Sequence, residues 1–491
     1  MIFGSGCVTD EATPGAAGAP ATAGSSNNGQ AGSPFNPGGA GSSVGGAPAA
    51  AGAFSVAGSS PVAGAAGAPA AGGTGNTAGA APTAGAGPTA GAGPTAGAGP
   101  VGTYNPDFVE FVGKDCKVTD PAAVDNAKLP DLFKFFDGTR MTKKSEWACR
   151  RAELKKAVEK FIHGEKPGRP DTVTGTVSAT SINVHVEHGG KMIDFKVSVS
   201  LPSGASGPVP AIIGLGGGSL DKGIVSGEGV ATINYDNNAM ASETSRSGLF
   251  TTIYGSTGAS AQVGWAWGVS RIIDVLVDEK KAGRNNIIDP TGIGITGCSR
   301  LGKGAFTIGA FDERIALGIP QESGTGGVSA FRVVNTAPKG PNGMAAQSLD
   351  SAWTEAQGWF GTAFGANRSK VNTIPADTHS LVAMYAPRGL LVLDNSRIGE
   401  LCATCQHAAT ASAAELYKAI GAEKNIEYNG GNPSDPHNHC SFYAASQGEP
   451  LKRAIRAFLT KKAAPDGRIA PAAVATADLT KWIDGTPPTL Q

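Results

Sequence analysis

The first hundred residues of this chain lack almost every side chain that could build a core or carry charge. From Met1 to about Thr103 the sequence is mostly Ala, Gly, Pro, Ser and Thr, and its only charged residues are Asp10 and Glu11. So few large apolar side chains cannot offset a backbone entropy cost of roughly 1–2 kcal/mol per residue. We therefore predict that residues 1–103 are a disordered linker, with a repeated Gly-Ala-Gly-Pro-Thr-Ala spacer that lacks the Gly-X-Y period of collagen.

The chain also lacks an excess of charge of either sign and any long apolar run. It has 40 basic and 40 acidic residues without a basic cluster, so nucleic acid and anionic membrane surfaces are poor partners. No apolar run approaches the roughly 20 residues of a membrane span. The start, Met1–Gly6, is too short and uncharged for a signal peptide, so we expect that the signal was removed or the start misassigned. Gly4–Cys7 resembles the end of a lipoprotein signal, which would make Cys7 a lipid anchor.

Cysteine is scarce, and its seven copies allow three pairs and one unpaired residue. We expect Cys7 to be the unpaired one. A low-complexity spacer is typical of exported multidomain enzymes, which favours disulfides over free cytosolic thiols. In an exported domain, Cys116 and Cys149 would staple the N-terminal region, and Cys402 and Cys405 would pair with each other or not at all.

Residues 104–491 have normal charge density and suffice for one large domain. Apolar patterns alternate between the two kinds of element. We expect strands at 194–201, 209–215, 230–233, 293–296, 315–320 and 390–394, and helices at about 264–281, at about 408–420 and in a small-residue segment ending near 309. This order predicts an α/β domain with a mostly parallel, doubly wound sheet and chemistry at the carboxyl ends of its strands.

The glycine-rich turn 292–304 matches two nucleotide-binding motifs imperfectly. Its G-x-G-x-x-G match places two glycines inside the expected strand and does not open a βαβ fold. Gly297-x-x-x-x-Gly302-Lys303 matches a phosphate-binding loop, with 390–394 as a possible Mg²⁺-binding strand. Position 304 is glycine, however, where that loop needs Ser or Thr to bind Mg²⁺. A nucleotide is therefore the weakest interpretation of this turn.

The same turn also fits a nucleophile elbow, a sharp strand-to-helix turn that lifts a serine hydroxyl above the sheet. Ser299 stands where that motif requires. The usual pattern is G-x-S-x-G, and here the second glycine comes one place late, as Gly297-Cys-Ser-Arg-Leu-Gly302. The residues alone leave the choice between the elbow and its competitors open.

Three segments together resemble the glucuronoyl esterases of carbohydrate esterase family 15: Gly297–Gly304, Pro320-Gln-Glu-Ser-Gly324 and His439-Cys440-Ser-Phe442. The likeness continues through 386–390, Asp394-Asn395 and 482–484, and that family uses the late glycine. The resemblance implies a three-layer α/β-hydrolase fold. It also implies hydrolysis of the ester that joins a lignin alcohol to 4-O-methyl-glucuronic acid on xylan, without a cofactor; we expect no metal site.

Carried over by position, the resemblance implies a Ser-His-Glu triad. Ser299 would be the nucleophile, His439 the general base and Glu322 the acid that orients the imidazole. Asp394, at the end of a later strand, is the alternative acid. Spacing alone does not separate His439 from His437, and the resemblance selects His439 because that family places its histidine directly before the cysteine.

The resemblance also implies roles for polar residues that would otherwise be read as surface residues. Arg300 would contribute its backbone N–H, and its guanidinium, to an oxyanion hole. Lys303, Gln347 and Glu355 would bind the glucuronate hydroxyls. His379 is a structural residue by default.

Two further features follow from the resemblance. It implies a disulfide between Cys298 and Cys440, which would tether the histidine loop to the elbow. The family tryptophan expected after Asp394-Asn395 is missing, since the chain reads Asn395-Ser-Arg-Ile-Gly-Glu400. We expect a secreted monomeric esterase that acts on glucuronoxylan or lignin-carbohydrate esters, and its main rival is a non-catalytic carbohydrate-binding module on the same fold.

Overall fold

The computed structural model describes residues 105, 107–432, 434–436, 438–469 and 477–491. The predicted linker, with Cys7, lies outside these residues, and so does His437. A domain that begins at 104 therefore stays a prediction. No helix within the described residues is both long enough and apolar enough to cross a membrane.

Nine strands of the described part form one sheet, in the order β1-β2-β3-β5-β4-β6-β7-β8-β9. Their bounds are β1 Thr172–Val177, β2 Ser181–His188, β3 Lys191–Ser200, β4 Val209–Leu215, β5 Ala231–Tyr235, β6 Ile288–Cys298, β7 Ile315–Gln321, β8 Gly389–Leu393 and β9 Ile426–Asn429. The first three strands and β5 pair antiparallel, and all pairs from β5 to β9 are parallel. The prediction of a mostly parallel sheet is confirmed.

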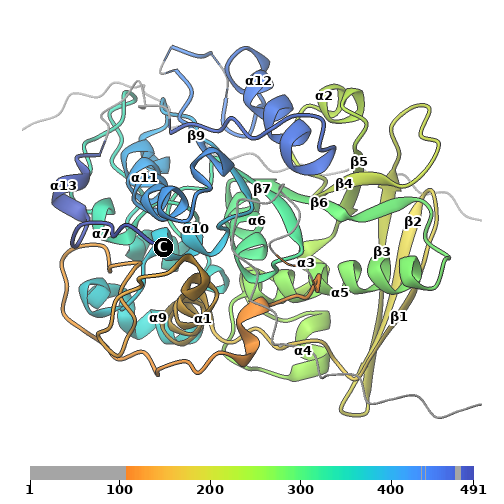
Figure 1. Cartoon of the computed structure of the whole chain (residues 1–491), viewed down its shortest axis with the longest axis horizontal. Helices are drawn as coiled ribbons and strands as arrows, with labels where there is room; N and C mark the ends of the chain where they lie inside the picture. The colour runs from red at the N-terminus through yellow and green to blue at the C-terminus, as the bar shows by residue number, and fades with distance from the viewer. Residues whose placement is uncertain (1–104, 106, 433, 437, 470–476) are drawn as a thin grey trace, which may run out of the picture. The chain divides into compact units, whose positions relative to one another are not determined.

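Helices cover the sheet on both sides (Figure 1). The α-helices are α1 Trp147–Val158, α2 Lys222–Gly227, α3 Asn237–Met240, α4 Leu249–Tyr254, α5 Ala261–Lys281, α6 Arg300–Phe311, α7 Phe331–Val334, α8 Leu349–Glu355, α9 Thr362–Asn367, α10 Thr378–Met384, α11 Ala403–Ala419, α12 Ala444–Ala454 and α13 Leu479–Trp482. Short 3-10 or π segments are η1 Val112–Asp115, η2 Lys144–Glu146, η3 Glu159–His163, η4 Gln357–Trp359, η5 Arg368–Thr373, η6 Gly399–Leu401, η7 Glu423–Asn425 and η8 Ile455–Leu459.

Residues of the parallel strands alternate between two apolar cores, as the two-residue period of a strand requires. In β4, Ala211 and Ile213 belong to the large core beneath α5 and α6, whereas Ile212 belongs to a smaller core beneath α2, α12 and η8. Figure 1 shows α2 and α12 above the sheet and α5 below it. The three-layer α/β architecture is confirmed.

The carboxyl ends of the parallel strands bring the candidate residues to one rim of the sheet. Cys298, Gln321, Leu393 and Asn429 end β6 to β9 and pair in register across the four strands. Ser299, Glu322 and Asp394, which follow three of these strand ends in the sequence, therefore emerge side by side.

A buried ion network anchors the segment before α1 to the body of the domain. Glu110 contacts the Lys166 ammonium and accepts a 2.6 Å hydrogen bond from Arg271. Both cations are almost completely buried, and Arg271 also pairs with Asp274. Removing the Glu110 charge would leave the almost completely buried Lys166 ammonium without this carboxylate.

We expect Glu110→Gln to lower the free energy of unfolding by about 3–5 kcal/mol, because a broken buried pair leaves an uncompensated charge. Urea denaturation followed by circular dichroism measures this loss. The control Glu449→Gln, at an exposed pair with Lys452, should change it by less than about 0.5 kcal/mol. Equal effects of the two substitutions would show that the network does not stabilise the fold.

Candidate active site

The turn between β6 and α6 has the geometry of a nucleophile elbow. Ser299 has a φ of 58°, which residues other than glycine rarely adopt, and its side chain does not cap the helix that follows. A Cβ atom at Gly297 would lie 2.4 Å from the Leu301 carbonyl oxygen, and one at Gly302 would lie 2.5 Å from that of Gln321. Gly302, the late glycine of the motif, is therefore required where α6 passes the end of β7.

Gly304, which weakened the phosphate-loop interpretation, lies inside α6 against α5. A Cβ atom at this position would lie 2.4 Å from the Trp265 ring. The site has no room for the Ser or Thr hydroxyl that would bind Mg²⁺. Close packing of α5 on α6 accounts for the glycine.

Glu322 and His439 are hydrogen-bonded. The His439 Nδ1 atom lies 2.6 Å from Glu322 Oε2, which also accepts the Cys440 N–H at 2.9 Å. Glu322 is buried at the end of β7, and His439 is partly exposed. A carboxylate at Nδ1 holds the proton on that nitrogen and leaves Nε2 as the acceptor, the tautomer that a general base needs.

The other oxygen of the Glu322 carboxylate is also held. Gln321 Nε2 lies 3.5 Å from Glu322 Oε1, and the Ser219 hydroxyl donates to Gln321 Oε1 at 2.7 Å. This chain joins the loop after β4 to the acid. We infer that it limits rotation of the carboxylate.

Asp394 has different partners. Its carboxylate accepts hydrogen bonds from the Tyr428 hydroxyl at 2.9 Å and from the Asn395 N–H at 2.8 Å. Complete burial raises the pKa of Asp394 to about 7. Because the structure joins the His439 ring to Glu322, the geometry favours Glu322 over Asp394 as the acid.

Three disulfides are present among the described residues, and each expected pairing is confirmed. Cys116 joins Cys149, Cys298 joins Cys440, and Cys402 joins Cys405. The second links the end of β6 to the residue after His439. Its two sulfurs and a His439 ring nitrogen lie within 4.8 Å of one another, but disulfide sulfurs are not the thiolates that bind metal ions.

We expect the Cys298→Ala, Cys440→Ala double variant to lose about 2–4 kcal/mol of unfolding free energy. It should also lose kcat, because the histidine loop is no longer fixed to the elbow. The matched control is Cys116→Ala with Cys149→Ala, which should lose stability and keep kcat. Urea denaturation and ester hydrolysis measure the two effects, and an unchanged kcat in the first variant would contradict the tether.

Ser299 and His439 line one open cavity of about 610 Å³. Its other lining residues are Lys303, Gly324, Ala345, Ala346, Gln347, Ser348, Ser351, Glu355, Trp359, Ile398, Glu400 and Leu401. The cavity thus brings together five of the seven residues expected from the sequence to act in catalysis or substrate binding. Glu322 lies behind His439, and Arg300 follows the serine in the chain.

The polar wall of this cavity is built around Lys303. Its ammonium donates to the carbonyls of Ser323 at 2.6 Å and Thr325 at 2.7 Å. Its Nζ lies 4.7 Å from the centre of the Trp359 ring. Burial lowers the pKa of Lys303 to about 8. An ammonium has three N–H donors, so one remains for a ligand hydroxyl.

Gln347 and Glu355 lie on the same wall. Gln347 Nε2 donates to Glu355 Oε2 at 2.6 Å, which orients the amide and leaves its oxygen as an acceptor. Together with Lys303 these groups offer the donors and acceptors that several neighbouring hydroxyls need.

Comparisons with known proteins agree with this geometry. Residues 184–421 match the family described as glucuronyl esterase, fungi. The 4-O-methyl-glucuronoyl methylesterase of Hypocrea jecorina is 38% identical over 378 residues, which cover 74% of this chain and 76% of that protein. The chain belongs to the glucuronoyl esterase family.

Solved structures of this family have the same fold. The catalytic domain of a glucuronoyl esterase from Hypocrea jecorina matches with a TM-score of 0.68 and 36% identity, over 76% of this chain and 99% of that domain. A glucuronoyl esterase from Sporotrichum thermophile matches with a TM-score of 0.64 and 35% identity, over 77% and 100%. That protein is a serine-to-alanine mutant in complex with methyl 4-O-methyl-β-D-glucopyranuronate.

In this member of the glucuronoyl esterase family, Trp359 lines the cavity, and it was not predicted from the sequence. Ile398 lines the cavity in the segment where the family tryptophan was expected, and Trp359 lies against Lys303. The available signal was an aromatic residue four positions after Glu355. It could not be recognised without knowing that η4 folds back onto α6.

Arg300 begins α6, where the first N–H groups of a helix have no intrahelical acceptor. The three consecutive glycines after β4, a second possible source of oxyanion donors, use their N–H groups on the carbonyls of Tyr235, Gly214 and Leu215. The guanidinium of Arg300 is largely exposed and pairs with Glu243, Nε to Oε1, at 3.2 Å. The geometry therefore favours the backbone N–H of Arg300 as an oxyanion donor.

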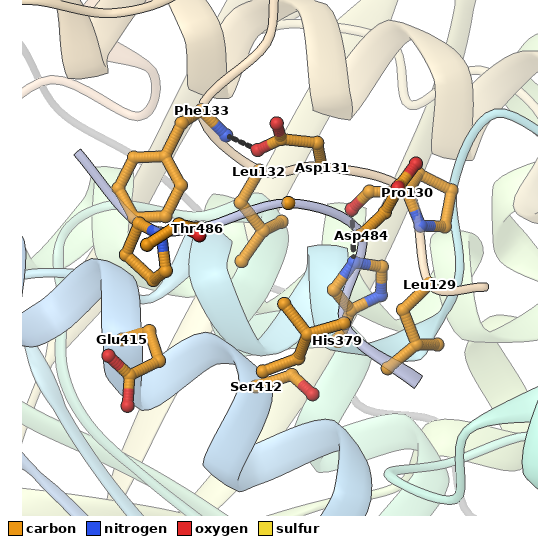
Figure 2. Close-up of a pocket in the computed structure, with 13 residues that line it drawn as sticks. Leu129, Pro130, Asp131, Leu132, Phe133, His379, Ser412, Glu415, Asp484 and Thr486 are labelled. Atoms are coloured by element: carbon orange, nitrogen blue, oxygen red, sulfur yellow. Dashed lines mark hydrogen bonds between the residues drawn. The ribbon is translucent and has the colours of Figure 1, made fainter. Parts of the chain in front are cut away.

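His379 has the structural role expected of it, away from the cavity that Ser299 and His439 line. Figure 2 shows its ring between the segment 129–133 and α11. The His379 Nε2 atom lies 2.8 Å from the Pro130 carbonyl oxygen. Burial lowers the pKa of His379 to about 4, so the ring is neutral at physiological pH. The adjoining cavity of about 20 Å³ has room for a water molecule and no more.

Proposed function

We propose that this chain hydrolyses esters of glucuronic acid or 4-O-methyl-glucuronic acid by acyl transfer through Ser299. The observation that carries the proposal is that Ser299 and His439 open into one cavity while Glu322 holds the His439 ring at 2.6 Å. Membership of the glucuronoyl esterase family supports it. So does the relative that binds a methyl glucuronate ester.

In the proposed reaction, His439 Nε2 accepts the Ser299 proton as the serine oxygen attacks the ester carbonyl. The backbone N–H of Arg300 donates to the resulting oxyanion. The bond to the alcohol then breaks, and the imidazolium returns its proton to the departing oxygen. A water molecule, deprotonated by His439, then attacks the acyl-enzyme. The bond between the acyl group and the Ser299 oxygen breaks, the imidazolium returns its proton to that oxygen, and the free glucuronic acid is released.

We further propose that Lys303, Gln347 and Glu355 bind the sugar hydroxyls and place the ester carbonyl over Ser299. The polymer in this proposal is glucuronoxylan esterified to lignin alcohols. We also propose that the protein is secreted and monomeric. Disulfide formation in three pairs supports an oxidising compartment.

The experiment compares benzyl glucuronate, benzyl galacturonate and benzyl acetate as substrates. We expect release of benzyl alcohol from the glucuronate with kcat/KM at least about 100-fold above that for the acetate, because a site with buried polar groups discriminates strongly against ligands that leave them unpaired. Equal rates would show a general esterase. Retention on glucuronoxylan without release of alcohol would show a carbohydrate-binding module.

A further inference from the structure

The loop between α3 and α4 is fastened to the segment that carries Trp359. The Glu243 carbonyl accepts the Gly358 N–H at 2.9 Å, and a Cβ atom at Gly358 would lie 2.1 Å from that oxygen. Arg246 donates to the Gln357 carbonyl at 2.7 Å and the Phe360 carbonyl at 3.1 Å. The backbone of Glu243 is therefore fixed beside η4.

From this position, the two carboxylate oxygens of Glu243 hold two different elements. Oε1 lies 3.2 Å from Arg300 Nε, and Oε2 accepts the Trp359 indole N–H at 2.9 Å. Arg300 directly follows the nucleophile, and Trp359 lies against Lys303 on the wall of the cavity. Glu243 itself does not line the cavity.

We propose that Glu243 is a positioning residue, which couples the serine end of the cavity to its sugar-binding wall through Arg300 and Trp359. The inference rests on the proposed function, because it concerns the same reaction. Glu243 fixes the Arg300 side chain at the start of α6 and fixes the face that the Trp359 ring presents to Lys303. Its charge, with that of Glu355, also favours the ammonium form of Lys303 against the effect of burial on its pKa.

Glu243→Gln separates this role from simple packing, because glutamine has the same shape and a single acceptor oxygen. One of the two donors, Arg300 or Trp359, must then face the amide NH₂. Hydrogen bonds to charged groups contribute enough that we expect kcat/KM for benzyl glucuronate to fall about tenfold or more. The exposed Glu187 on β2 provides the matched control, and Glu187→Gln should change kcat/KM by less than about twofold.

A double-mutant cycle shows whether the effect passes through the two partners. The double variant Arg300→Met with Trp359→Phe removes the guanidinium and the indole N–H that face Glu243, and it keeps an aromatic ring at position 359. In this double variant, Glu243→Gln should lower kcat/KM by less than about twofold. An unchanged tenfold loss in that background would overturn the proposal. Absence of hydrolysis by the wild-type protein would instead refute the proposed function, before the cycle is made.

Two further measurements keep the proposal falsifiable if Glu243→Gln unfolds. Arg246→Ala removes the other anchor of the loop without touching the carboxylate contacts, and we expect a lower urea midpoint with kcat/KM within about threefold of wild type. A tenfold loss of kcat/KM in Arg246→Ala would show that docking of the loop alone accounts for the effect, and it would overturn the role proposed for the Glu243 carboxylate. With Glu243 intact, the effects of Arg300→Met and Trp359→Phe on kcat/KM should not add up to the effect of the double variant. Strict additivity would contradict the coupling.

Discussion

Replacing Ser299 with alanine is expected to lower kcat for benzyl glucuronate by at least about 10⁴-fold, because loss of the nucleophile removes the covalent step and leaves only binding and oxyanion stabilisation. The fold should not change, since the Ser299 side chain does not cap α6. Release of benzyl alcohol, measured at substrate concentrations above and below KM, gives kcat and KM separately. We expect KM to change by only a few-fold.

The matched control for this variant is Ser441→Ala, one residue beyond the Cys440 tether. It removes a hydroxyl from the histidine loop without removing the nucleophile, and kcat should stay within about threefold of wild type. Equal release of alcohol by wild type and Ser299→Ala would show that Ser299 is not the nucleophile. The resemblance of the turn to a nucleophile elbow would then say nothing about catalysis.

The second large effect is expected for Glu322→Gln, which should lower kcat by about 10³–10⁴-fold. The amide can present its NH₂ to His439 Nδ1, which favours the wrong tautomer for a general base, as the equivalent change does in other triads. Asp394→Asn is the control, because the structure gives Asp394 other partners. We expect it to keep kcat within about threefold. The reverse order of effects would make Asp394 the acid.

Asp394→Asn also carries a pH prediction. The folded-state pKa of Asp394 is raised to about 7 by burial, above an unfolded-state value of about 3.9. The stability that its protonated form contributes is therefore complete below about pH 4 and is lost as the pH rises through 7. The unfolding free energy of Asp394→Asn, relative to wild type, should increase between pH 4 and pH 8. Denaturation at several pH values measures it, and a flat difference would contradict the shift.

The sequence predicted those parts of the fold that follow from local pattern. The expected strand at 209–215 coincides with β4, the one at 315–320 ends one residue before β7 does, and the one at 390–394 is shifted by one residue from β8. Buried parallel strands are continuous apolar runs, which are easy to recognise. The edge strand β1 and its neighbour β2, which pair antiparallel and follow one another in the chain, were not predicted. Helix α11 begins at Ala403, five residues before its expected start.

The candidate site was predicted less from pattern than from resemblance. The late glycine could not be explained until the Gln321 carbonyl was seen beside Gly302. His439 and His437 could not be separated by spacing. Glu243 gave no signal, because its two partners, Arg300 and Trp359, are brought to it by the packing of three segments that are distant in sequence. Such contacts depend on tertiary structure alone.

The most direct test of the catalytic assignment is covalent labelling with an alkyl fluorophosphonate, which phosphonylates an activated serine. Peptide mass mapping should find one adduct, on the peptide that contains Ser299, and an excess of methyl glucuronate should slow its formation. Labelling should be lost in Ser299→Ala and strongly slowed in Glu322→Gln. An adduct on another residue, or an unlabelled protein that still hydrolyses benzyl glucuronate, would contradict the mechanism.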